Sequence, residues 1–152
     1  SDIFVKDLST GAVTLVSQGP NGEPANGASS GAWSSSDGTV IGFSTLATNL
    51  VQGGSEAVKN NGAQQVVVVS NRGLGRSSFF VSRNLTTGAL GNGDSTQLRI
   101  TPDGRWGVFE STASNLVEGD TNGVADVFRF EMNEARTAVV RLERVSTSRY
   151  EF

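Results

Sequence analysis

The chain has 152 residues, of which 36% are hydrophobic and 18% charged, and its net charge is −3. This length suits one domain or a part of one. The absence of cysteine and histidine excludes disulfides, thiol nucleophiles, the Ser-His-Asp triad and zinc sites that use imidazole. The negative charge argues against a nucleic-acid partner, and no apolar run approaches the roughly 20 residues of a membrane-spanning helix.

Ten short runs of apolar and β-branched residues, separated by turns rich in glycine, asparagine and serine, predict ten β-strands. In chain order they span residues 3–7, 13–17, 31–35, 39–44, 65–70, 78–83, 97–101, 105–110, 126–131 and 137–146. Neighbouring runs should pair as antiparallel hairpins, so the sequence predicts an all-β fold. Residues 44–51 and 111–117 could each form one helical turn, but we expect surface loops with their leucine and valine packed underneath.

The sequence contains an internal repeat with a shift of 66 residues. Residues 26–51 match residues 92–117 without a gap. The identical positions, named in the first copy, are Asn26, Gly27, Ser29, Asp37, Gly38, Phe43, Ala47, Asn49, Leu50 and Val51. In both copies an Asp-Gly turn joins two strands, which is a strong hairpin signal. We call this unit the inner hairpin.

A second unit, the outer hairpin, occurs three times, within residues 2–17, 65–82 and 126–146. Its third turn, near Asn133 and Glu134, has no glycine and is the weakest of the three. The order is one outer hairpin followed by two pairs of inner and outer hairpins, which predicts four-stranded antiparallel blades of β-propeller type. The single propeller-like region, 1–152, then divides into an outer hairpin (1–18), a first blade (19–83) and a second blade (84–152), about two and a half blades.

The second copy resembles the TolB-like (WD-repeat-like) propeller repeat of bacterial periplasmic and extracellular proteins. The residues that carry the resemblance are Pro102-Asp103-Gly104, Phe109, Ser111, Ala113, Asn115-Leu116-Val117, Gly119-Asp120-Thr121-Asn122-Gly123 and Asp126-Val127-Phe128. The first copy keeps Ser36-Asp37-Gly38, Phe43 and Asn49-Leu50-Val51, but its loop is longer and has no counterparts of the spaced Asp120 and Asp126. The resemblance covers almost the whole chain and implies a propeller fold and export to the periplasm or the cell exterior.

Propellers carry many activities, so the resemblance says little about function. We expect a non-enzymatic binding or scaffold module with a protein or carbohydrate partner. The alternative is part of a propeller-type enzyme that acts on polysaccharide or peptide. No residue spacing favours a catalytic pair, and we assign no catalytic residue.

Two and a half blades cannot close a ring, because propellers have 4 to 8 blades. We therefore expect either a missing remainder of the propeller or self-association. Packing of the first outer hairpin on the third within one chain would also cover the open ends. A small sandwich built from the same hairpins is a further possibility.

One loop, residues 118–126, offers oxygen ligands at alternate positions and suggests a calcium site. Asp120 and Asn122 supply side-chain oxygens, a backbone carbonyl near Val124 follows, and Asp126 closes the set. The spacing is similar to the start of an EF-hand loop, but its twelfth position, Glu131, lies in a predicted strand. A site here would therefore be short and weak.

The alternative to calcium is an Asx-turn, in which Asp120 and Asn122 accept hydrogen bonds from their own backbone. In the first copy Gln65 stands where Asp126 stands in the second, so no ion is expected there. Trp33 and Trp106 lie near the two inner hairpins, where exposed rings would stack on a sugar or a partner. We expect both to fill the core.

Overall fold

The computed structural model describes residues 1–51, 62–72 and 75–146. In these residues it contains ten strands and no helix, so the all-β prediction is confirmed. The strands are β1 (Phe4–Lys6), β2 (Val13–Leu15), β3 (Ser29–Ser34), β4 (Val40–Thr45), β5 (Gln65–Ser70), β6 (Ser77–Phe80), β7 (Ser95–Ile100), β8 (Trp106–Ser111), β9 (Asp126–Met132) and β10 (Val139–Arg144). No described segment is a helix long and apolar enough to cross a membrane.

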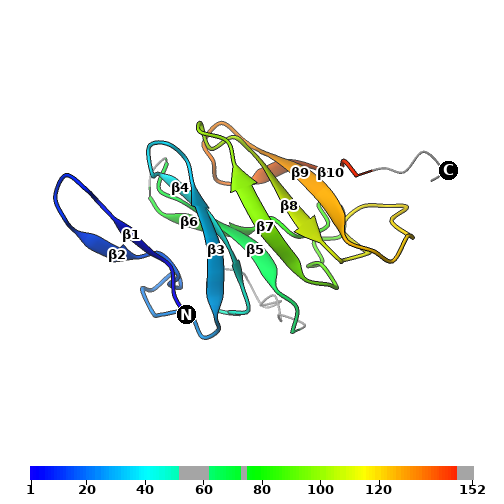
Figure 1. Cartoon of the computed structure of the whole chain (residues 1–152), viewed down its shortest axis with the longest axis horizontal. Coiled ribbons are helices and arrows are strands. Elements are labelled where there is room, and N and C mark those ends of the chain that lie inside the picture. Colours follow the sequence, from blue (N-terminus) through cyan, green and yellow to red (C-terminus); the bar gives the residue numbers. More distant parts are fainter. Residues whose placement is uncertain (52–61, 73–74, 147–152) are drawn as a thin grey trace.

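The strands form two four-stranded antiparallel sheets and one two-stranded hairpin. The first sheet has the order β3-β4-β5-β6, the second has the order β7-β8-β9-β10, and β1 pairs with β2. Both sheets are simple meanders, in which each strand pairs with the next in the chain. Figure 1 shows the hairpin β1–β2 and the strands β9 and β10 at opposite ends of the molecule, so the first outer hairpin does not pack on the third within one chain.

Strand β3 begins two residues earlier than predicted because it contains a bulge. The β3–β4 register shifts between Ser30 and Trp33, and Gly31 takes a φ of +65°. The second copy repeats the bulge in β7, where Gln97 takes a φ of +56°. A bulge leaves one residue unpaired and bends the strand, which hides the alternation from which the strand start was predicted.

The two central strands of the middle sheet, β4 and β5, are buried on both faces, whereas β3 is exposed from its second residue onward. Strand β5 has the sequence Gln-Val-Val-Val-Val-Ser, and all six residues are buried, as expected for a strand covered on both sides. One face packs on the second sheet through a cluster that includes Val40, Val66, Val68, Leu98, Phe109, Phe128 and Phe130. The other face packs on the hairpin β1–β2 through a cluster that includes Ile3, Val16, Ile41, Phe43, Val67 and Phe80.

The residues that repeat along the sequence make the same hydrogen bonds in both copies. The Asn49 Oδ1 atom accepts from the Asn26 N–H at 3.0 Å, and the Asn115 Oδ1 atom accepts from the Asn92 N–H at 2.9 Å. These bonds hold the loop after the inner hairpin, and beneath it Leu50 and Leu116 are buried, as predicted. The loop contains no helical turn in either copy.

All three outer hairpins are closed by the same serine contact, which we call the serine latch. The hydroxyls of Ser17, Ser82 and Ser146 accept from the backbone N–H groups of Ile3, Val66 and Val127 at 2.8–3.0 Å. The same hydroxyls donate to the side chains of Asp2, Gln65 and Asp126. The pairs β1–β2, β5–β6 and β9–β10 are therefore structurally equivalent.

The glycine-free third turn is closed by an arginine. Arg136 takes a φ of +57°, in the left-handed region that glycine usually occupies. Its N–H donates to the Asn133 carbonyl, and its guanidinium donates to the carbonyls of Asn133, Glu134 and Asp103. These bonds stabilise a backbone conformation that costs an ordinary residue roughly 1–2 kcal/mol.

Packing between the two sheets predicts a strong effect at Gly42. A Cβ atom on Gly42 would lie 2.2 Å from Leu98 Cδ2 and 2.9 Å from Ile100 Cδ1. We expect Gly42→Val to lower the free energy of unfolding by about 1–3 kcal/mol, because overpacking separates the sheets. The control is Val108→Ile, at the exposed equivalent position of the second sheet, with a change within about 0.5 kcal/mol. Urea denaturation measures both, and equal effects would contradict this packing.

Candidate functional site

The loop predicted to bind calcium contains two buried carboxylates that face an arginine. Asp120 is 8% exposed and Asp126 is 3% exposed. Arg144, which ends β10, places its Nη1 atom 3.1 Å from Asp120 Oδ1 and 3.5 Å from Asp126 Oδ2. The guanidinium thus supplies positive charge at the place where a cation would neutralise the two carboxylates.

The other two predicted ligands, Asn122 and the carbonyl near Val124, do not contact Arg144 in the described hydrogen bonds. The Asn122 Nδ2 group donates to Asp126 Oδ2 at 2.9 Å, so this amide joins the cluster. Its Oδ1 atom accepts from the Val124 N–H at 3.1 Å, which is the Asx-turn contact considered as the alternative. The Val124 side chain is 61% exposed. The structure therefore brings Asp120, Asn122 and Asp126 together around Arg144.

Asp126 also has a structural role, because it belongs to the third serine latch. Its Oδ1 atom accepts from the Ser146 hydroxyl at 2.5 Å, as Asp2 and Gln65 do in the other two latches. Burial by itself would raise the pKa of Asp126. Hydrogen bonds from Ser146 and Asn122 and the charge of Arg144 outweigh burial and hold this pKa below its usual range.

Calcium binding remains a prediction, and Arg144 is its specific competitor. Among the described residues, no group of three or more histidine, cysteine, aspartate or glutamate side chains is close enough to hold a metal ion. Two carboxylates and one amide fall short of the 6 to 8 oxygens that calcium takes, so carbonyls and water would supply the rest. Sequence reasoning missed Arg144 and Ser146, because they come from the end of β10 and the residues just after it rather than from the loop.

The repeated turn aspartates are structural. Asp37 Oδ1 accepts from the Ser35 hydroxyl at 2.6 Å, and Asp103 Oδ1 accepts from the Thr101 hydroxyl at 2.6 Å. The Ser35 bond, together with bonds from Arg72 and Thr39, lowers the pKa of Asp37. In the first outer hairpin, bonds from the hydroxyl and N–H of Ser9 and from the Thr10 N–H lower the pKa of Asp7 to about 2. These carboxylates are ionised turn acceptors.

The prediction that both tryptophans fill the core is wrong for Trp33. This residue is 44% exposed, and its Nε1–H donates to the Ile100 carbonyl at 3.0 Å, on the neighbouring sheet. The Arg99 guanidinium lies 4.6 Å from the centre of its ring. Trp106 is partly exposed, and the Arg129 guanidinium lies 5.3 Å from its ring centre. Both rings already stack on arginines of the same chain.

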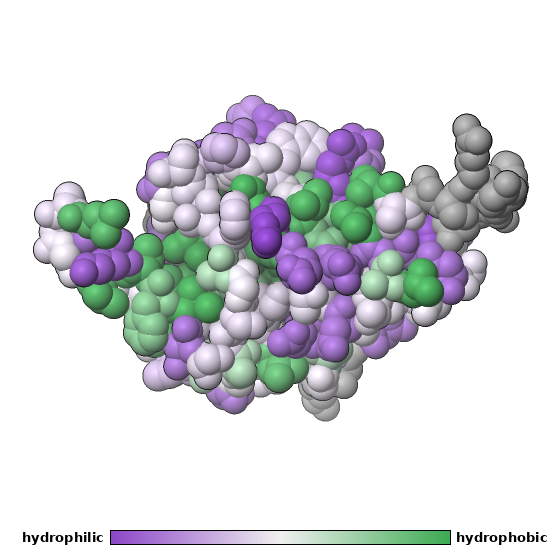
Figure 2. Space-filling model, viewed as in Figure 1, coloured by the Kyte–Doolittle hydropathy of each residue, from purple (hydrophilic) through white to green (hydrophobic). Residues whose placement is uncertain are grey.

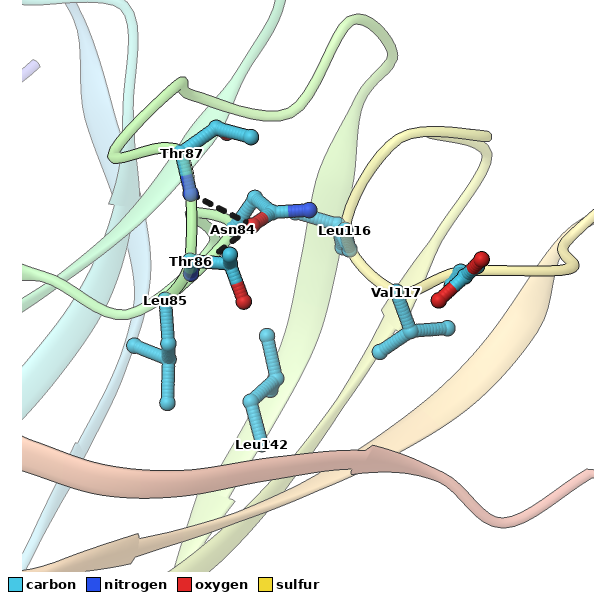
Figure 3. A pocket seen from close by; sticks show the side chains of 8 residues that line it. Asn84, Leu85, Thr86, Thr87, Leu116, Val117 and Leu142 are labelled. Atoms are coloured by element: carbon cyan, nitrogen blue, oxygen red, sulfur yellow. Dashed lines mark hydrogen bonds between the residues drawn. The ribbon is translucent and has the colours of Figure 1, made fainter.

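A cleft of about 490 Å³ opens between the outer parts of the two sheets (Figure 3). Its apolar residues are Leu85, Leu116, Val117 and Leu142, and its polar residues are Asn84, Thr86, Thr87 and Glu118. A neighbouring hollow of about 360 Å³ shares Leu85 and continues along β6 and β10, past Phe79 and Val139. Glu118 is the one carboxylate among the described residues of the cleft.

Asn84, which lines the cleft, begins the Asn-Leu-Thr sequence typical of N-glycosylation sites. Its Oδ1 atom accepts from the N–H groups of Thr86 and Thr87, both at 2.9 Å, as Figure 3 shows. Its Nδ2 group donates to the Asn115 carbonyl at 2.9 Å. The oxygen and the nitrogen of the Asn84 amide therefore both form hydrogen bonds within the fold. Asp7 accepts the equivalent two backbone bonds in the turn of the first outer hairpin.

The arginine–carboxylate cluster predicts how the loop responds to calcium. We expect Arg144→Met to lower the free energy of unfolding by about 1–3 kcal/mol in calcium-free buffer, because two buried carboxylates lose their counter-charge. If the loop binds calcium, millimolar calcium raises the melting temperature of Arg144→Met more than that of the wild type. Magnesium raises it less, because it requires near-octahedral geometry.

Two further variants control this calcium experiment. Asp126→Asn should remove the response, and Asp37→Asn should leave it unchanged. A melting temperature that is indifferent to calcium and chelator in both the wild type and Arg144→Met would contradict the calcium prediction and leave Arg144 as the counter-ion of the loop.

The lowered pKa of Asp126 predicts a pH dependence. Because the folded pKa lies below the unfolded value of about 3.9, the carboxylate stabilises the fold fully above that pH. This stabilisation is lost as the pH falls towards the folded pKa. We therefore expect Asp126→Asn to lose less stability than the wild type between about pH 5 and pH 2. Denaturation at a series of pH values tests this, and parallel losses would rule it out.

Comparison with known proteins adds no family to this picture. No protein-family model matches the chain, and no curated protein matches it. The resemblance to the TolB-like repeat therefore remains a prediction from the sequence.

Proposed function

We propose that the chain is a non-enzymatic binding or scaffold module built from β-propeller-type blades of an exported bacterial protein. The blade assignment is supported by the two meander sheets, which stack through one continuous core, and by the three latched outer hairpins. Export follows from the resemblance alone. Self-association or completion by further blades remains part of this proposal.

The observation that carries the proposal is that the acidic residues of the turns and of the β9–β10 hairpin are used by the fold. Asp37 and Asp103 close turns, and Asp126 closes a latch and pairs with Arg144. Glu131 pairs with Arg105 at 2.8 Å. Hydrolysis of a glycosidic bond requires two carboxyl groups that flank the bond, and the described lining of the cleft contributes Glu118 alone. Its leucines and valine suit a binding surface.

Binding, unlike catalysis, requires neither a catalytic metal ion nor a nucleophilic side chain. Calcium at the loop of Asp120 and Asp126 would stabilise the second sheet, because a ligand that binds only the folded state adds RT ln(1 + [L]/Kd) to its stability. A protein or carbohydrate partner is consistent with the apolar cleft and its hydroxyl-bearing rim of Thr86 and Thr87.

The alternative, a part of an enzyme that acts on polysaccharide or peptide, predicts turnover that depends on Glu118. We expect the purified chain to release no product from a panel of polysaccharides and casein, and Glu118→Gln to behave in the same way. Reducing-end and fluorescent-peptide assays measure this. Product release that is lost in Glu118→Gln but kept in the solvent-side control Glu110→Gln would overturn the binding proposal in favour of the enzyme.

A further inference from the structure

The described residues contain four asparagines that are each followed by glycine. They are Asn21, Asn26, Asn92 and Asn122, and a fifth, Asn61, lies outside the described residues. An asparagine before glycine is prone to lose its side-chain amide, because glycine has no Cβ atom that keeps its backbone nitrogen away from the asparagine Cγ atom. Deamidation turns a neutral side chain into a carboxylate. The place of each pair in the fold therefore decides where the charge changes.

The two repeated asparagines are bound to a neighbouring loop. The Asn26 Nδ2 group donates to Thr48 Oγ1 at 2.7 Å, and its Oδ1 atom accepts from the Thr48 N–H at 2.8 Å. Asn92 makes the same two bonds with Ser114, at 3.0 Å and 2.8 Å. Movement of either side chain towards its own glycine nitrogen would break both bonds.

The glycines of these two pairs are packed against the same loops. A Cβ atom on Gly27 would lie 2.7 Å from the Ala47 nitrogen, and one on Gly93 would lie 2.6 Å from Thr112 Oγ1. The backbone at both glycines is therefore enclosed. Deamidation at these pairs requires local opening of the loop, and the free energy of that opening lowers the reaction rate.

In the pair Asn21-Gly22 the glycine nitrogen already has a partner. The surroundings of Gly22 are open, but its N–H donates to the Gly19 carbonyl at 3.0 Å. The Asn21 N–H donates to Glu23 Oε2 at 3.1 Å, which also holds this turn. Attack on the asparagine requires the Gly22 nitrogen to leave its bond, so this pair should react more slowly than one whose glycine N–H is not engaged.

The pair Asn122-Gly123 lies in the exposed loop before β9. Both residues are exposed, and apart from the chain neighbours no heavy atom lies within 4 Å of the Cβ position of Gly123. Among the hydrogen bonds of the described residues, none is donated by the Gly123 N–H. The loop is yellow at the right of the molecule in Figure 1, and Figure 2 shows hydrophilic side chains at the surface there.

The two bonds of the Asn122 side chain stay within its own loop. Its Oδ1 atom accepts from the Val124 N–H at 3.1 Å, and its Nδ2 group donates to Asp126 Oδ2 at 2.9 Å. Addition of the Gly123 nitrogen to Cγ places negative charge on Oδ1, and a backbone N–H at that oxygen stabilises such an intermediate. Because Val124 directly follows Gly123, this bond can persist while the bond to Asp126 breaks.

We propose that Asn122 is a deamidation site that reacts faster than the other described Asn-Gly pairs, and that its product carboxylate destabilises the cluster around Arg144. The Gly123 nitrogen forms a bond to Asn122 Cγ, the bond from Cγ to Nδ2 breaks, and Nδ2 leaves as ammonia with the proton of the Gly123 N–H. Water then opens the cyclic imide. Attack at Cγ gives aspartate, and attack at the backbone carbonyl carbon gives isoaspartate. The reaction requires water alone and does not depend on the binding function proposed above.

The new carboxylate changes the charge balance of the loop. Asp126 Oδ2 loses the amide donor, and one guanidinium, that of Arg144, then faces three carboxylates instead of two. We expect Asn122→Asp to lower the melting temperature by at least about 2 °C in chelator. An unchanged melting temperature would overturn the effect on the cluster.

Incubation of the full chain in chelator at mildly alkaline pH tests the rates. Trypsin places Asn122 in the peptide 106–129, Asn92 in 84–99, and both Asn21 and Asn26 in 7–59, where fragment-ion spectra separate them. Mass spectrometry over time measures the conversion of amide to acid. We expect Asn122 to convert at least tenfold faster than Asn26 and Asn92, because their loops must open first, and also faster than Asn21.

The same chain unfolded in guanidinium chloride is the matched control. Each pair has glycine as its second residue, so the four rates should become similar once no fold restrains them. In the folded chain, Thr48→Val removes the acceptor of the Asn26 amide at an exposed position. This variant should speed conversion of Asn26 and leave that of Asn122 unchanged. Asn122→Gln should abolish the early conversion in peptide 106–129, which also contains Asn115.

Three results would overturn the proposal. They are conversion of Asn122 in the folded chain that is no faster than that of Asn26 and Asn92, conversion of Asn21 that is faster than that of Asn122, and early conversion in peptide 106–129 that persists in Asn122→Gln. None of these results affects the hydrolysis assay with Glu118→Gln, so failure of this proposal leaves the binding function untouched.

Discussion

Burial of the central strands β4 and β5 on both faces is the constraint on which the rest of the structure depends. It explains why β5 is a continuous run of valines and why Gly42 must leave room for Leu98. It also sets the two ends of the stack apart. The hairpin β1–β2 and the second sheet each pack one face on the middle sheet. The other face of each is left uncovered. The second sheet meets solvent with the ion pair of Arg129 and Glu143 and with the exposed side chains of Val108 and Val127, and the hairpin β1–β2 exposes Phe4.

Hydrogen bonds that recur in the repeated hairpins identify the residues whose role is structural. The latch serines, the loop asparagines and the turn aspartates recur because each accepts a hydrogen bond from a backbone N–H group of its hairpin, loop or turn. Asp126 belongs to this structural set and also to the cluster with Asp120 and Arg144. Positions that differ between the copies, such as Val68 and Arg129, mark where one sheet is packed and the other is exposed.

The sequence predicted all ten strands and their antiparallel pairing, because alternation and Asp-Gly turns are local signals. It missed the bulge in β7, because Gln97 takes a left-handed conformation without being glycine. Trp33 was misplaced because its exposure depends on how the neighbouring sheet stacks. In the candidate metal loop, the spacing of Asp120, Asn122 and Asp126 was visible, but Arg144 lies 18 residues after Asp126 and reaches it only through the β9–β10 register. Contacts between strands are not encoded in local spacing.

Amide hydrogen exchange along the three equivalent strands tests the central claim most directly. If β1 is an outer strand with an open edge, the amides of Phe4 and Lys6 exchange rapidly, while those of Val67 and Val69 in β5 and of Phe128 and Phe130 in β9 are protected by β4 and β8. The amides of Ile3 and Val5, which face β2, should exchange more slowly than those of Phe4 and Lys6. Equal protection of Phe4 and Val67 in the isolated chain would contradict the account, because it would mean that the edge of β1 is already paired.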